Sequence, residues 1–206
     1  IPSEVTKGLP VTFGPTQSGG ASLKWFAEDV LGTDIHSAEF LAEKTDKGSD
    51  GMIFLPYISG ERSPIWNPNA TGSFHYIKST TKAGSFVRSV MEGVAFSIRH
   101  VLEVCSPDRK AEKIRISGGG AKSDLWAQIK SDVNGVPVEL LKCQDASSLG
   151  AAITASICSG IYSDISEATK KMVHTDKIIY PDENSAETYD LLYEKYLEES
   201  KRASEN

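Results

Sequence analysis

Apolar and polar residues form blocks along this chain that predict helices and strands in turn. The clearest helical repeat lies in residues 82–105, where apolar side chains three and four positions apart predict one long helix with a broad buried face. Further helical patterns cover six shorter ranges: 19–31, 37–47, 123–134, 147–158, 164–172 and 184–199. Continuous apolar runs predict three buried strands: 52–55, 114–117 and 136–141. Strands that alternate with helices predict a layered α/β domain.

Local signals mark the ends of these elements and one pairing between side chains. Ser18 is placed to cap the first helix, and Gly32 follows its end. In the long helix, Arg88 and Glu92 lie one turn apart, where an exposed ion pair adds only about 0.3–0.5 kcal/mol. Residues 57–69 are rich in proline, glycine and charge, which predicts a long ordered loop.

The predicted helix 147–158 carries a stripe of unusually small side chains. Its members are Gly150, Ala151, Ala152, Thr154 and Ala155. Small side chains let another backbone or a flat ligand come close. We therefore expect Gly150→Leu to damage folding or ligand binding, since overpacking a tight contact costs about 1–3 kcal/mol.

Composition narrows the class of protein. The net charge of −6 and the scattered basic residues argue against a nucleic-acid-binding surface. No apolar run reaches membrane-spanning length, and no secretory leader opens the chain. The odd number of cysteines argues against a disulfide framework, and Cys105 and Cys158 are predicted to be buried thiols of a protein in a reducing cytoplasm. The four histidines show no metal-ligand spacing, which predicts no zinc site.

The strongest chemical signal is a strand that runs into three successive glycines and then a helix. Without a Cβ atom at Gly118, Gly119 and Gly120, the backbone can adopt positive φ angles and touch a ligand directly. The N-terminus of the following helix offers free N–H groups to an anion or to the polar edge of a base. The same glycines also fit a tight strand–helix turn that binds nothing.

A dinucleotide site is a second functional interpretation of this turn. Gly118-x-Gly120-x-x-Ser123 approximates the dinucleotide-binding pattern, and Glu139 lies where a ribose-binding acid is expected. The third glycine of that pattern is replaced by Ser123, and the unit comes late in the chain. Both features weaken an NAD-binding interpretation without removing it.

Five segments of this chain occur together, in this order and at this spacing, in one known family. They are LPYISGERSP at 55–64, NPNATGSF at 67–74, RSVMEGVAF at 88–96, ISGGGAKS at 116–123 and LGAA at 149–152. The chain therefore resembles the FGGY family of carbohydrate kinases over nearly its whole length. The amino-acid sequence of the first segment most resembles that of xylulokinase-like and gluconokinase-like members.

The resemblance implies an actin-like, ribonuclease-H-like ATPase fold, in which two lobes close over ATP and Mg²⁺. Residues 1–206 would form the carboxy-terminal lobe, an α/β structure with a mixed sheet flanked by helices. In the family, the catalytic Asp and the glycine–threonine hairpin that holds the phosphates precede the stretch matched here. We therefore expect the chain to be cut from a longer protein, to contain no catalytic and no metal-binding residue, and to be inactive alone.

The family's nucleotide contacts can be placed on this sequence residue by residue. They fall on Gly20, Lys24, Gly118, Gly119, Gly120, Ala121 and Ser123. Lys24 is equally compatible with a solvated helix lysine, Gly20 with a packing glycine, and Ser123 with an N-cap.

Four residues around the first signature segment are harder to assign. Tyr76 stands where the family pattern prefers a glycine, which calls the local turn into question. Glu61 and Arg62 are expected to brace the loop as an ion pair rather than to act in catalysis. Trp66 fits either the core or an interface.

The resemblance implies transfer of the γ-phosphoryl group of ATP to a small sugar, with a ketopentose such as xylulose as the favoured acceptor. It also suggests a homodimer. One alternative is a regulatory module that holds nucleotide without chemistry, and the other is the NAD-binding oxidoreductase domain.

Overall fold

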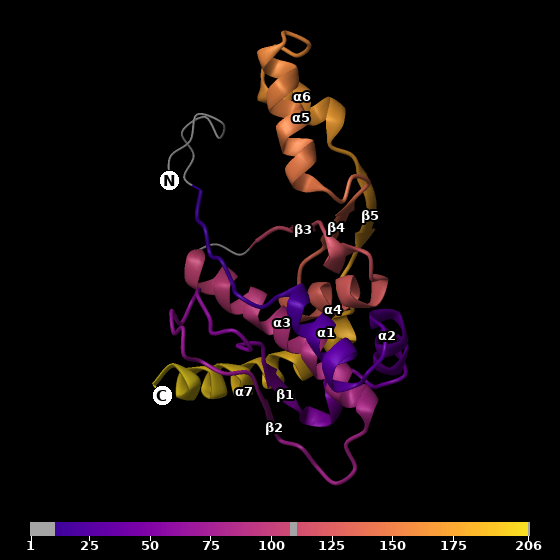
Figure 1. Ribbon diagram of the computed structural model, residues 1–206, viewed down its shortest axis with the longest axis vertical. Coiled ribbons are helices and arrows are strands. Elements are labelled where there is room, and N and C mark those ends of the chain that lie inside the picture. The colour runs from indigo at the N-terminus through magenta and orange to yellow at the C-terminus, as the bar shows by residue number, and fades with distance from the viewer. Residues whose placement is uncertain (1–10, 108–110, 206) are drawn as a thin grey trace.

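The protein is described by a computed structural model, which covers residues 11–107 and 111–205 (Figure 1). The helices are α1 Gly20–Trp25, α2 Ile35–Glu43, α3 Ala83–Cys105, α4 Asp124–Asn134, α5 Ala146–Cys158, α6 Ile165–Met172 and α7 Ala186–Glu205. The strands are β1 Ile53–Leu55, β2 Ser73–His75, β3 Ile114–Ile116, β4 Val138–Leu141 and β5 Thr175–Ile179. A π-helical turn, Phe26–Val30, continues α1, and short 3₁₀ turns occupy Ser49–Gly51, Gly119–Ala121 and Glu183–Ser185.

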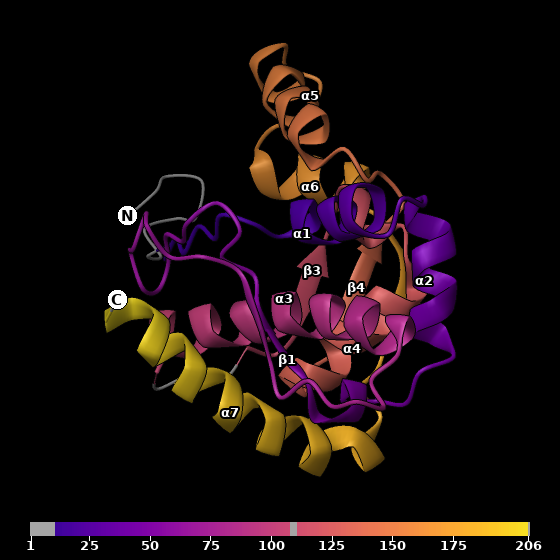
Figure 2. The ribbon, with the colours of Figure 1, turned by 60° about the horizontal axis from the view of Figure 1, so that its bottom comes forward.

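Helix α3 runs through the middle of the body, with α7 on one side and α1 and α2 on the other (Figure 2). Its apolar residues are buried from Val87 to Phe96, as the helical repeat predicts. They form one core with β1, α4 and a row of aromatic side chains on α7: Tyr189, Tyr193 and Tyr196. Burial of such large apolar side chains supplies most of the stability of a domain of this kind.

The ion pair of α3 lies in this core rather than at the surface. The Nε atom of Arg88 donates to Oε1 of Glu92 over 2.9 Å, and both side chains are at most 5% exposed. Glu92 also accepts bonds from the backbone of Gly48, the hydroxyl of Ser49 and the hydroxyl of Tyr189. The predicted pairing is therefore confirmed, but the small energy of an exposed pair does not apply, because this pair is the centre of a buried polar network that joins α3 to α7.

Two small sheets complete the body. β1 and β2 pair antiparallel, and in the second sheet β4 lies between β3, which is parallel to it, and β5, which is antiparallel. A second, smaller core lies beneath this mixed sheet and includes Ala121, Ala127 and Val138. β2 and β5 are additional to the predicted strands.

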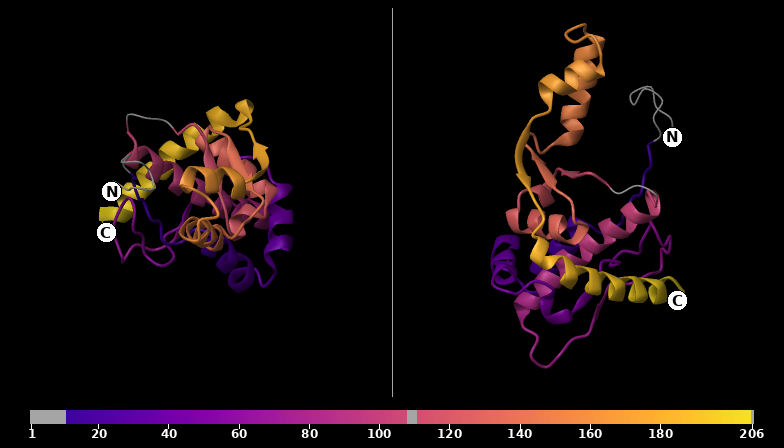
Figure 3. Two further views of the ribbon diagram at one scale, coloured as in Figure 1. Left: turned by 90° about the horizontal axis from the view of Figure 1, so that it is seen from above. Right: turned by 180° about the vertical axis from the view of Figure 1, so that it is seen from behind.

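The hairpin of α5 and α6 projects from the body, and the right view of Figure 3 shows that the other helices do not surround it. Only Ile153 and Ser156 of α5 are buried. A Cβ atom added to Gly150 would meet nothing within 4 Å, so the expectation of a close-packed small-residue stripe is wrong for this chain. Cys158 is exposed for the same reason and Cys105 is only half-buried, which corrects the prediction of two buried thiols.

The start of α1 also differs from the prediction. Gly19 is the N-cap and no side chain caps the helix. The carbonyl oxygen of Ser18 instead accepts a bond from the hydroxyl of Ser22, so Ser18 acts through its backbone. Leu23 and Phe26 are buried as expected, whereas Val30 is half exposed because the chain leaves the core in the π-helical turn.

Candidate functional site

A hollow of about 900 Å³ opens where the glycine turn faces α1 and α2. Its walls come from the start of α1, one face of α2, the middle of α3, the end of β3 and the start of α4. The polar and glycine residues that line it are Gly19, Gly20, Lys24, His36, Glu39, Ser117, Gly119, Gly120, Lys122, Ser123 and Lys130. Five of the seven predicted nucleotide contacts therefore lie around one hollow: Gly20, Lys24, Gly119, Gly120 and Ser123.

The glycine turn leaves bare backbone on this wall. Gly118 has φ 76° and ψ −163°, a conformation that is essentially restricted to glycine. Of the three glycines of the turn, Gly118 adopts the positive φ that the glycine run permits, whereas Gly119 and Gly120 do not. A Cβ atom at Gly119 would meet nothing within 4 Å, so its missing side chain leaves room in the hollow rather than relieving strain.

Two further residues of the predicted set lie beside the hollow rather than in its wall. Gly118 lines a smaller adjoining hollow together with Gln144 and Asp145. Ala121 is 5% exposed and packs in the small core, where it supports the turn from behind. The structure therefore gives Ala121 a packing role, and direct contact with a ligand remains a prediction.

Ser123 has the structural role that the sequence predicts. Its hydroxyl oxygen accepts a bond from the backbone N–H of Trp126 over 3.1 Å, which caps α4. Gly135, with φ 64°, ends the same helix in the left-handed conformation that glycine tolerates. Ser123 therefore fixes where α4 begins and Gly135 where it ends, and the capped N-terminus of α4 lies at the hollow.

On the opposite wall, Gly20 is the first residue of α1 and a Cβ atom there would meet nothing within 4 Å. It is therefore not a packing glycine in this chain. The ammonium of Lys24 lies 3.9 Å from the carboxylate of Glu28, and both side chains are largely exposed. Lys24 is thus a solvated lysine at the mouth of the hollow, from which it can reach an anion.

Sequence reasoning missed Lys130. This residue is 6% exposed, and its Nζ atom donates to the carbonyl oxygen of Gly120 over 3.1 Å. It also lies 4.2 Å from the centroid of the Trp126 ring. Its position four residues after Trp126 was the available signal, because that spacing places both side chains on one helix face.

Glu61 and Arg62 brace the loop that contains residues 55–64, but they do not form the expected ion pair. Oε1 of Glu61 accepts bonds from the backbone N–H groups of Gln17 and Arg62, over 2.6 and 2.8 Å. The guanidinium of Arg62 instead donates to the carbonyl of Thr16. Burial raises the pKa of Glu61. The pair therefore holds the loop against the segment before α1, but through backbone groups.

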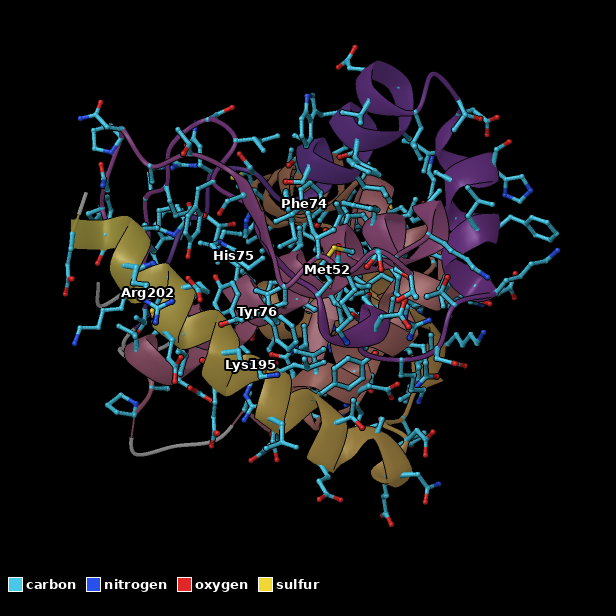
Figure 4. The ribbon with its side chains drawn as sticks, turned by 90° about the horizontal axis from the view of Figure 1, so that it is seen from below. Met52, Phe74, His75, Tyr76, Lys195 and Arg202 are labelled. Atoms are coloured by element: carbon cyan, nitrogen blue, oxygen red, sulfur yellow. The ribbon has the colours of Figure 1, made fainter. Side chains whose placement is uncertain are left out.

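The turn at Tyr76 is present although the family pattern prefers a glycine there. Its φ is 63°, the left-handed conformation for which the family pattern supplies glycine. Its hydroxyl donates to Glu199 of α7 over 2.7 Å, and Figure 4 shows Tyr76 directed at this helix. Trp66 is 64% exposed and belongs to neither core.

Glu139, the residue expected to bind the ribose of a dinucleotide, is bound to two neighbouring cations instead. The carboxylate of Glu139 accepts bonds from Lys113 over 2.6 Å and from Arg115 over 2.7 Å. These two cations hold the pKa of Glu139 below its usual range. A carboxylate committed to two neighbours on its own sheet is poorly placed to bind a ribose, which weighs against the NAD interpretation.

The described residues offer neither a metal site nor a membrane span. No cluster of three histidine, cysteine or acidic side chains in residues 11–107 and 111–205 could hold a metal ion. None of the helices in these ranges has the length and apolar composition needed to cross a membrane. The glycine-walled hollow is therefore the feature on which a function has to be built.

Comparison with known proteins agrees with this geometry. The model of the FGGY family of carbohydrate kinases, C-terminal domain, matches residues 2–159. A gluconokinase of Bacillus licheniformis is 31% identical and is matched by 98% of this chain over 42% of its own length. The solved ligand-bound xylulose kinase of Lactobacillus acidophilus has a TM-score of 0.83 at 30% identity, over 90% of this chain and 38% of that one.

A glycerol kinase of Plasmodium falciparum, solved with ADP, shares the fold with a TM-score of 0.73 at 24% identity, over 87% of this chain and 36% of its own. The chain thus spans about two fifths of the length of these relatives. The predicted actin-like α/β fold is confirmed, because the structural neighbours are kinases of this fold. The chain belongs to the FGGY family of carbohydrate kinases and contains the family's C-terminal domain.

Proposed function

We propose that this chain forms the adenosine-binding lobe of an ATP-dependent sugar kinase. The observation that carries the proposal is the hollow whose wall at Gly119 and Gly20 has no Cβ atom and no packing neighbour. A flat base and a ribose can lie against such bare backbone, with the capped N-terminus of α4 nearby. The similarity to a gluconokinase and to a xylulose kinase supports phosphoryl transfer to a sugar.

The residues around the hollow fit a nucleotide. Gly119 and Gly120 offer backbone, Ser123 offers a hydroxyl, and Lys24 offers a cation for a negatively charged group. Mg²⁺ bound with ATP would neutralise the charge that develops on the phosphoryl oxygens. The described residues hold no acidic cluster for it, so we propose that the metal enters with the nucleotide.

The role of this lobe is positioning. Phosphoryl transfer depends mainly on alignment and on stabilisation of charge, so a lobe that fixes the adenosine contributes by fixing the direction of the phosphates. We propose a ketopentose such as xylulose as the acceptor, and a cytoplasmic protein that works as a homodimer. A panel of xylulose, gluconate and glycerol, assayed by ADP release from the protein that contains this lobe, identifies the acceptor. If none of the three acceptors causes ADP release, the result favours a regulatory module that binds nucleotide without chemistry.

The site itself is tested by Gly119→Val. The added side chain projects into the hollow and meets no protein atom within 4 Å at its Cβ, so we expect the variant to fold normally. The dissociation constant for ATP should rise about tenfold or more, equivalent to roughly 1.4 kcal/mol. Calorimetry with ATP and with NAD, on the parent and on the variant, measures both affinities.

Gly150→Val is the matched control, because its added Cβ also meets nothing within 4 Å but lies on the projecting hairpin. It should leave ATP affinity unchanged. A well-folded Gly119→Val protein that binds ATP like the parent contradicts the proposed site, and tight binding of NAD by the parent would restore the dinucleotide interpretation.

A further inference from the structure

A second hollow, of about 380 Å³, lies where β2 meets the end of α7. Among the described residues, it shares no lining residue with the glycine-walled hollow. Figure 4 shows His75 beside α7, the helix that carries Arg202. The polar residues that line the second hollow are Asn69, Thr71, Ser73, His75, Glu199 and Arg202. A volume of this order can hold a small organic molecule.

Three of these side chains form a continuous chain of polar contacts. Ser73 and His75 are two positions apart on β2, which places both side chains on one face of the strand. The Oγ atom of Ser73 lies 2.8 Å from Nε2 of His75, and Nδ1 of His75 lies 3.4 Å from Oε2 of Glu199. A hydroxyl, an imidazole and a carboxylate in this order form the arrangement that activates a serine as a nucleophile.

The carboxylate of Glu199 is held in place and stays ionised. It is 5% exposed, and its Oε1 atom accepts bonds from the hydroxyl of Tyr76 over 2.7 Å and from Nη1 of Arg202 over 2.6 Å. Burial alone raises the pKa of Glu199, but these bonds and the charges of His75 and Arg202 outweigh burial and hold the pKa below its usual range. Oε1 takes these two bonds, while Oε2 faces His75.

This carboxylate decides which nitrogen of neutral His75 carries the proton. We assign the proton to Nδ1, since Nδ1 faces the negative charge of Glu199. Nε2 then has a lone pair, to which the O–H group of Ser73 donates. The contact of 3.4 Å is long for a charge-assisted bond, but catalytic bonds are often long before a substrate binds.

Donors for a developing negative charge line the same hollow. They are the guanidinium of Arg202 and the side-chain amide of Asn69. Groups of this kind stabilise the oxyanion that forms when a hydroxyl attacks a carbonyl carbon. Ala70 and Ala203 add small apolar surfaces, which suit a short acyl chain.

We propose that Ser73 is the nucleophile of a site that hydrolyses small carboxylic esters, with His75 as general base and Glu199 as a positioning residue. The Oγ atom of Ser73 attacks the carbonyl carbon while its proton passes to Nε2 of His75. The bond to the alcohol oxygen then breaks, and the alcohol leaves with that proton. Water, deprotonated by His75, cleaves the acyl group from Ser73 and releases the carboxylic acid. This activity does not rest on the proposed nucleotide site.

An alkyl fluorophosphonate, which bonds to the Oγ atom of an activated serine and releases fluoride, is the probe. We expect the folded protein to be labelled at Ser73, as mapped by peptide mass spectrometry, and to hydrolyse para-nitrophenyl acetate. Ser73→Ala should abolish the label. His75→Gln and Glu199→Gln should slow labelling about tenfold or more, because a positioned base contributes about 10²–10⁴-fold. Absence of a label at Ser73 in the folded parent overturns the inference.

Ser163 offers a matched control, because this exposed serine donates to the carboxylate of Glu167 over 2.7 Å instead of to a histidine. Ser163→Ala should leave both the label and ester hydrolysis unchanged. Hydrolysis that persists undiminished in Ser73→Ala would come from a histidine acting without the serine, and contradicts the inference. A melting curve for each variant separates loss of activity from loss of fold.

Ser73→Cys gives a second readout that does not depend on the folding of Glu199→Gln. A thiol beside His75 loses its proton more easily than an ordinary thiol, and the thiolate is the reactive form. At pH 7 we expect iodoacetamide to alkylate position 73 about tenfold faster than the exposed Cys143 of the same protein. His75→Gln in this background should remove the difference. Equal rates at positions 73 and 143 in Ser73→Cys overturn the inference.

Discussion

Helices α3 and α5 lie in two regions of the molecule, and each carries glycine and alanine on its faces. In α3, Gly84 and Gly93 face other backbone segments so closely that an added Cβ atom would press on the carbonyl oxygens of Leu41 and Phe54. In α5, an added Cβ atom at Gly150 meets nothing within 4 Å. The same residue types therefore accompany close packing in one helix and open solvent in the other.

The difference shows what a stripe of small residues can and cannot indicate. Small side chains permit a close approach, but the approaching partner is set by the rest of the chain. For α3 that partner is β1 and α2, which the chain supplies a few dozen residues earlier. For α5, residues 11–107 and 111–205 supply only α6 and a few flanking contacts.

The largest difference between the two regions should come from buried charge. Arg88→Met in α3 leaves Glu92 buried without its cation, and removal of one partner of a buried pair costs about 3–5 kcal/mol. Lys170→Met on the exposed face of α6 should change the unfolding free energy by no more than about 0.5 kcal/mol. Urea denaturation of both variants measures the contrast, and similar midpoints for the two would contradict the buried network.

A smaller contrast, with opposite signs, is expected from adding one methyl group. Gly93→Ala should destabilise the protein by about 1–3 kcal/mol, because its Cβ atom presses on the carbonyl of Phe54. Gly150→Ala should stabilise α5 by up to about 1 kcal/mol, the difference in helix propensity. Thermal melting compares them, and a destabilising Gly150→Ala would mean that α5 packs against something in solution.

The smallest effect is a difference in pH dependence. Burial raises the pKa of Glu61, so the folded state binds its proton more tightly, and this contribution to stability is present at low pH and is lost as pH rises through the raised pKa. Bonds from the backbone and hydroxyl of Ser163 lower the pKa of Glu167 in the hairpin, so its contribution is present at neutral pH and is lost on acidification.

Glu61→Gln should therefore gain stability relative to the parent as pH rises from 4 to 7, whereas Glu167→Gln should lose stability over the same range. Hydrogen exchange at each pH separates the body from the hairpin. Identical pH profiles for the two variants would contradict the assignment of opposite environments.

Local chemistry explains which parts of the fold could be predicted from the sequence. Helix α4 was predicted to within one residue because Ser123 and Gly135 mark its ends with their own side-chain and backbone preferences. β5 was missed because four of its five residues are exposed, so it lacks the apolar run that marks a buried strand. Its pairing with β4 comes from residues more than 30 positions away, which no local pattern reports.

The candidate site divides in the same way. Gly119, Gly120 and Ser123 could be found because a glycine run before a helix is a local signal, and Gly20 and Lys24 because a family pattern carries them. Lys130 was missed, because its spacing from Trp126 shows only that the two side chains share a helix face, and reports neither the burial of Lys130 nor the distance between its ammonium and Gly120.

Tyr76 has a consequence for how this sequence can change over evolution. It occupies a left-handed backbone position at a cost of about 1–3 kcal/mol for a residue other than glycine, and its hydroxyl bond to Glu199 offsets part of that cost. A mutation of Glu199 alone removes this compensation, whereas the same mutation after Tyr76→Gly is tolerated more easily. The order in which the two positions are substituted therefore matters, and we expect the two substitutions to be epistatic, although Glu199 also pairs with Arg202 and His75.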